Sequence, residues 1–66
     1  MAPTTEITLV GDVHHCVEGD AGAVERAILA AARGSIMELA WLIDAETGER
    51  LGINPALVVS LRGQSA

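Results

Sequence analysis

Polar and apolar residues alternate near the start of the chain, and this alternation predicts a β-hairpin. Residues 6–10 and 13–17 are rich in β-forming side chains, which is typical of strands. The pair Gly11-Asp12 between them suits a two-residue turn, because glycine accepts the positive φ of the first central position. Such a turn places Leu9 opposite His14 and puts both side chains on one face of the hairpin.

Residues 21–33 are predicted to form one helix of about three turns. The segment is rich in alanine, with leucine, glutamate and arginine, all of which favour helices. Asp20 can accept the free N–H groups of the first turn, and Gly34 suits the position after the last turn. The apolar residues that recur at helical spacing predict a stripe facing the core: Val24, Ala27, Ile28 and Ala31.

The segment 35–43 is predicted to be a strand that is apolar on both faces. One face carries Met37, Leu39, Trp41 and Ile43, and the other carries Ile36, Ala40 and Leu42. A strand that is apolar on both faces is covered on both. We expect the helix to cover the face of Leu39 and Trp41. A second subunit is then expected to cover the opposite face, through Ile36, Ala40 and Leu42.

The remainder of the chain predicts a β-meander. Residues 44–49 read as a hairpin loop and residues 50–53 as the returning strand. Asn54-Pro55 ends that strand, because proline cannot donate to a ladder. Residues 56–57 suit a single helical turn, and residues 58–62 form the last strand.

The predicted fold class is α+β with the element order ββαβββ. One helix packs on a small, mainly antiparallel sheet, and oligomerisation buries the second face of that sheet. The single domain is expected to span residues 6–62, between a flexible N-terminus at 1–5 and a flexible tail at 63–66. A domain of 66 residues buries only about 60% of the surface of its unfolded chain, which also favours a homo-oligomer.

The charge and the single cysteine narrow the class of protein. The net charge is −5, with four arginines and no lysine, so the chain repels a phosphate backbone and nucleic-acid binding is not expected. No apolar run approaches the ~18 residues that would span a membrane, and no secretory leader is evident. A lone Cys16 is typical of a reducing compartment, so a cytoplasmic protein is expected.

His14, His15 and Cys16 are the only cluster of residues suited to metal or thiol chemistry. On a strand, His14 and Cys16 lie on one face about 7 Å apart and could reach one ion. No spacing such as CxxC or HExxH supplies further ligands. The favoured interpretation is a half-buried strand without a metal, a cofactor or a catalytic role.

Arg50, Arg62 and Trp41 are the candidate contacts for a small ligand. Arginines that converge in the fold or across an oligomer could bind an anion, and a tryptophan could stack on a base. The neighbours of Trp41 at period two are apolar, which favours a place in the core or an interface.

The C-terminal half resembles a group of small actinobacterial or phage proteins of unknown function. The resemblance lies in the hairpin over 39–53 and in the segment Gly-Ile-Asn-Pro-Ala-Leu-Val-Val at 52–59. Those proteins have a short hairpin, one helix and a β-meander that ends in an Ile/Val-Asn-Pro-x-x-Val element. The chain is also similar to Sm-like barrels in its last turn and strand, but their basic RNA-binding loops are missing here.

The sequence therefore predicts a non-enzymatic, homo-oligomeric interaction or regulatory module that binds a partner protein, with a phage as one possible source. The first alternative is an oligomer that binds or sequesters a small anion or nucleotide. The second alternative is a metal- or thiol-dependent activity at His14, His15 and Cys16.

Overall fold

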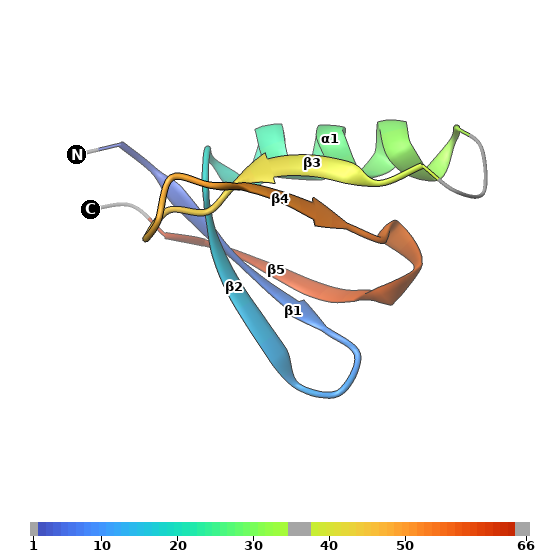
Figure 1. Ribbon diagram of the computed structural model, residues 1–66, viewed down its shortest axis with the longest axis horizontal. Helices are drawn as coiled ribbons and strands as arrows, with labels where there is room; N and C mark the ends of the chain where they lie inside the picture. Colours follow the sequence, from blue (N-terminus) through green and yellow to red (C-terminus); the bar gives the residue numbers. More distant parts are fainter. Residues whose placement is uncertain (1, 35–37, 65–66) are drawn as a thin grey trace.

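The computed structural model describes residues 2–34 and 38–64. It confirms a small α+β fold with the order ββαβββ and a single-turn 3-10 helix (η1) before the last strand (Figure 1). The elements are β1 (Thr4–Leu9), β2 (Val13–Glu18), α1 (Ala21–Ala32), β3 (Ala40–Ile43), β4 (Arg50–Ile53), η1 (Pro55–Leu57) and β5 (Val58–Gln64).

The strands form two antiparallel sheets that meet at one end. The first sheet has the order β2-β1-β5, and the second is the β3–β4 hairpin. An isolated bridge between Val17 and Asp44 joins β2 to the end of β3. Beside it, the N–H of Ala45 donates to the C=O of Cys16 at 2.9 Å. Figure 1 shows α1 lying along β3 on one side of the molecule.

The first hairpin has a register one residue different from the predicted one. Leu9 lies opposite Val13 and Thr8 opposite His14, so the loop has three residues instead of two. Both Gly11 (φ 87°) and Asp12 (φ 62°) adopt left-handed conformations, which glycine and aspartate tolerate better than most residues. The predicted pairing of Leu9 with His14 is therefore wrong.

This register separates an apolar face from a polar face. Thr5, Ile7 and Val17 are fully buried on the inner face. The hydroxyl of Thr5 donates to the C=O of Gly19 at 2.9 Å, which satisfies the one buried polar side chain of the described core. His14 lies on the outer face of β2 with an exposed ring, and it therefore does not share the inner face with Leu9.

The helix and its cap agree closely with the sequence prediction. The carboxylate of Asp20 accepts the N–H of Ala23 at 2.7 Å, and α1 ends at Ala32, one residue earlier than predicted. The predicted stripe is confirmed: Val24, Ile28 and Ala31 are buried and Ala27 is half-buried against them. The core cluster also contains Ile7, Val17, Ala40, Leu42 and Ile53.

The predicted faces of the strand after the helix are reversed. Ala40 and Leu42 are 2% and 9% exposed and belong to the core, whereas Trp41 is 55% exposed and Leu39 is 36% exposed. The expectation that α1 covers Leu39 and Trp41 is wrong, and so is the use of Ala40 and Leu42 as an oligomer interface. Ile36, the third predicted interface residue, lies outside the described residues. The described strand is also shorter than predicted, since it begins at Ala40.

The loops after β3 follow the sequence prediction. Gly48 adopts a left-handed conformation (φ 76°) in the loop that joins β3 to β4. The side chain of Asn54 accepts the N–H of Ala56 at 2.9 Å and caps η1. The paired ends of β1 and β5 reach past the predicted domain limits, because Thr4 lies opposite Gln64 and Thr5 opposite Gly63.

Candidate binding surface on the second hairpin

The outer face of the β3–β4 hairpin carries the exposed tryptophan of the chain. Trp41 lies directly opposite Gly52 in the register of the two strands. A Cβ placed on Gly52 would lie 3.1 Å from two carbons of the indole and 3.0 Å from a methyl carbon of Leu39. The absence of a side chain at position 52 therefore lets Trp41 and Leu39 lie across β4. We name the four residues Leu39, Trp41, Arg50 and Gly52 the hairpin face.

Arg50 completes the hairpin face with a cation. Its guanidinium carbon lies 4.7 Å from the centroid of the Trp41 ring, a distance typical of a cation–π contact. In the part of the chain that the structure describes, no ion pair joins Arg50 to a carboxylate. The N–H groups of the guanidinium therefore remain open to an acceptor on a partner.

The loop beside the hairpin face is acidic and is closed by several hydrogen bonds. The carboxylate of Asp44 accepts the N–H groups of Glu46 and Thr47 at 2.8 and 3.1 Å. The N–H of Asp44 donates to the C=O of Glu49 at 2.8 Å. Glu46 and Glu49 are exposed. The hairpin thus presents an apolar and aromatic surface flanked by negative charge, with Arg50 as its one cation among these residues.

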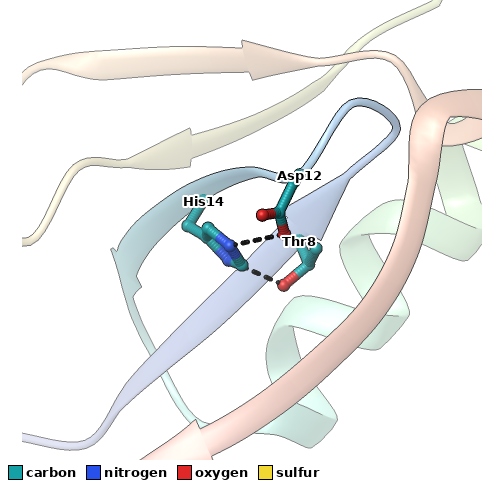
Figure 2. A network of polar contacts seen from close by, with 3 residues as sticks. All are labelled: Thr8, Asp12 and His14. Atoms are coloured by element: carbon teal, nitrogen blue, oxygen red, sulfur yellow. Dashed lines mark hydrogen bonds and ion pairs between the residues drawn. The ribbon is translucent and has the colours of Figure 1, made fainter.

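A polar network on the other sheet joins Thr8, His14 and Asp12 (Figure 2). The Nε2 atom of His14 lies 3.0 Å from a carboxylate oxygen of Asp12, and Nδ1 lies 3.0 Å from the hydroxyl of Thr8. In the neutral ring, Nε2 donates to Asp12 because a carboxylate only accepts. Thr8 then donates its proton to Nδ1.

This order of groups resembles a nucleophile, base and orienting acid, but its setting differs from that of an active site. The side chains of His14 and Asp12 are 47% and 88% exposed. The network lies on the open outer face of a sheet, where water screens each interaction. We assign it a local role in holding the β1–β2 loop.

His14, His15 and Cys16 are separated by the pleat of β2. His14 and Cys16 lie on its outer face, whereas His15 lies opposite Ile7 on the inner face. The thiol of Cys16 lies 3.7 Å from the side-chain oxygen of Gln64. Among residues 2–34 and 38–64, no group of three histidine, cysteine or acidic side chains is placed to hold a metal ion.

The predicted ligand residues are only partly brought together. Arg50 and Trp41 are in contact, but Arg62 lies in the other sheet, opposite Glu6. A hollow of about 210 Å³ lies between the N-terminal segment, the start of α1 and the end of β5. None of the three predicted ligand residues lines this hollow, whose lining residues are Pro3, Thr4, Asp20, Ala21, Gly63 and Gln64.

Leu39 and Gly52 are functional candidates that the sequence analysis did not select. A signal for Gly52 was present in β4, where two large apolar residues alternate with Arg50 and Gly52. Leu39 lies two residues before Trp41 and so shares its face. The apolar pair, Leu51 and Ile53, marks the inward face of the hairpin. Arg50 and Gly52 must then face outward, and so must the residues opposite them.

Comparison of the chain with protein-family models, curated proteins and solved structures finds no match. Within the described residues, no helix has the length and apolar content needed to cross a membrane.

Proposed function

We propose that this chain is a non-enzymatic protein-binding module and that the hairpin face is its contact surface. The observation that carries the proposal is the exposure of Trp41, whose ring lies across Gly52 beside Leu39 and Arg50. Tryptophan and arginine are enriched among the residues that dominate binding energies at protein interfaces. An apolar centre rimmed by charged residues is also the form that such interfaces take.

The partner protein is expected to place an apolar side chain on Trp41 and an acceptor against Arg50. The Arg50 guanidinium is already held by the indole, so little side-chain entropy remains to be lost when it binds. The cytoplasm is the proposed location, since Cys16 is a free, partly exposed thiol. An origin in an actinobacterial or phage genome stays a prediction.

Binding of a small anion by Arg50 and Trp41 is the second candidate. The cation–π contact supports it, because the same two groups could hold an anionic ring system. The outer face of a two-stranded hairpin buries a small molecule poorly, whereas pockets enclose most of a ligand's surface. A protein surface is therefore the better match to the hairpin face.

Site-directed photo-crosslinking in the native host tests the proposal. A benzophenone side chain at position 39 is expected to give one discrete protein adduct, and the adduct should disappear when Trp41→Ser is added. Position 29 provides a matched control, because Leu29 is an exposed leucine of α1 that lies outside the hairpin face. Equal yields at positions 39 and 29, or an adduct that persists with Trp41→Ser, would overturn the proposal.

A further inference from the structure

The free edge of β4 presents backbone groups that the described residues leave unpaired. Directly after the β3–β4 ladder, the N–H of Asp44 donates to the C=O of Glu49, which places these two residues at a hydrogen-bonded position of the register. Hydrogen-bonded and non-hydrogen-bonded pairs alternate along an antiparallel ladder. Ile43–Arg50 and Trp41–Gly52 are therefore the non-hydrogen-bonded pairs. The N–H and C=O groups of Arg50 and Gly52 point away from β3.

No other part of the described chain covers these groups. In the residues that the structure describes, β4 pairs only with β3, and no backbone hydrogen bond from another segment reaches Arg50 or Gly52. The next residues limit how far the edge extends. The C=O of Asn54 already accepts the N–H of Leu57 at 3.0 Å, and Pro55 has no N–H. Within β4, the open edge thus consists of two donors and two acceptors, which belong to Arg50 and Gly52.

We propose that β4 pairs with β4 of a second copy of this chain, antiparallel and about a two-fold axis. The inference rests on the proposed binding role of the hairpin face, because pairing of the two β4 strands would join two hairpin faces into one surface for the partner protein. With Leu51 opposite Leu51 of the second copy, each Arg50 meets the Gly52 of the other chain. Every outward N–H then finds an outward C=O, so the edge is its own complement.

Side-chain charge and size favour the same register. A shift that set Arg50 against Arg50 of the second copy would place like charges directly opposite each other, which is unfavourable. In the proposed register, Arg50 meets a glycine instead. Across the four paired strands, the residues that lie side by side are then Trp41, Gly52, Arg50 of the second copy and Ile43 of the second copy.

The missing side chain at Gly52 allows a cation–π contact between the two copies. Because Gly52 has no side chain, the indole of Trp41 and the guanidinium of the incoming Arg50 become neighbours. The contact repeats across the interface the cation–π pair that Arg50 and Trp41 make within one chain at 4.7 Å. The two hairpin faces then form one continuous surface of twice the width, open to the partner protein.

A pair of variants at position 50 isolates the backbone contribution. Arg50→Ala removes the guanidinium and keeps the N–H, whereas Arg50→Pro removes both. Proline is tolerated at edge-strand positions whose N–H faces solvent, so both variants should keep the far-UV circular dichroism and cooperative unfolding of the wild type. Sedimentation velocity should show a concentration-dependent dimer for the wild type and a weaker dimer for Arg50→Ala, which lacks the cation–π contact but keeps the backbone bonds. Arg50→Pro should raise the dissociation constant at least tenfold relative to Arg50→Ala.

Three outcomes overturn self-pairing. One is a wild-type chain that stays monomeric up to millimolar concentration, and another is a dimer that Arg50→Pro leaves unchanged. If Arg50→Pro unfolds, a synthetic chain of these 66 residues with N-methylglycine at position 52 lacks the Gly52 donor alone, and an unchanged dimer again overturns the inference. In each case crosslinking at position 39 to a different protein still supports the binding module. If the dimer is absent and position 39 also gives no protein adduct, the proposed function is rejected as well.

Discussion

Trp41 and Gly52 face each other across β3 and β4, and the indole lies over the position that a side chain at residue 52 would occupy. This pairing explains how an exposed tryptophan is held in one orientation on a surface. It also links the composition of a short edge strand to the surface that we propose for binding.

Gly52→Val should displace the indole without unfolding the domain. The new Cβ would lie 3.1 Å from two ring carbons, but the ring is exposed and can move outward. We expect the free energy of unfolding to change by less than about 1 kcal/mol, because surface substitutions outside special sites have small effects. Acrylamide quenching of the single tryptophan should increase.

Ser60→Val is a suitable control for that experiment. It adds valine at an exposed position of β5, in the other sheet, and should leave the quenching unchanged. Equal quenching in the wild type and in Gly52→Val would contradict the packing of Trp41 on β4.

Leu42→Ala and Leu39→Ala should differ strongly in their effects on stability. Leu42 is 9% exposed and lies in the core, so its truncation leaves a cavity and should cost about 2–5 kcal/mol. Leu39 is 36% exposed, and its truncation should cost less than about 1 kcal/mol. Urea unfolding followed by circular dichroism measures both. Similar losses for the two variants would mean that the faces of β3 are assigned incorrectly.

Thr5→Val should destabilise the fold although it adds an apolar methyl group. The buried hydroxyl of Thr5 donates to the C=O of Gly19, and its removal leaves a carbonyl with no donor. The expected cost is about 1–3 kcal/mol in the free energy of unfolding. Thr8→Val, on the outer face of the same strand, is the matched control. It removes only an exposed hydrogen bond to His14 that water can replace, so it should change stability by less than about 0.5 kcal/mol. A neutral result at Thr5 would show that water reaches Gly19.

The helix and the two later turns were predictable because local chemistry determines them. Asp20 supplies a cap that needs no tertiary contact, and the apolar stripe of α1 has one clear direction. The loop over 44–49 and the turn after Asn54 depend in the same way on residues within the turn itself.

The first register was missed because Gly11-Asp12 fits a two-residue turn as well as part of a three-residue loop. The observed pairing places Ile7, Leu9 and Val17 on the inner face, together with Val13. That arrangement separates apolar from polar residues more cleanly than the predicted one. The division of apolar and polar side chains between the two faces of the hairpin is therefore a better guide to the strand register than the Gly11-Asp12 pair alone.

The faces of β3 were reversed because both of its faces are apolar and periodicity cannot rank them. The partner strand contains the missing information, since Leu51 and Ile53 must face inward. Pairing places Leu42 opposite Leu51 and Ala40 opposite Ile53. With that correction, the exposed contact surface of β3 lies on the face of Trp41 and not on the face of Ala40, where the oligomer interface was predicted.

Residue-resolved amide hydrogen exchange at low and high protein concentration tests the open hairpin edge most directly. In dilute solution the amides of Arg50 and Gly52 should exchange rapidly, while those of Leu51 and Ile53 are protected by their bonds to β3. In concentrated solution Arg50 and Gly52 should become protected as β4 pairs with a second copy. Equal exchange of these two amides at both concentrations, or protection of both in dilute solution, would contradict the account.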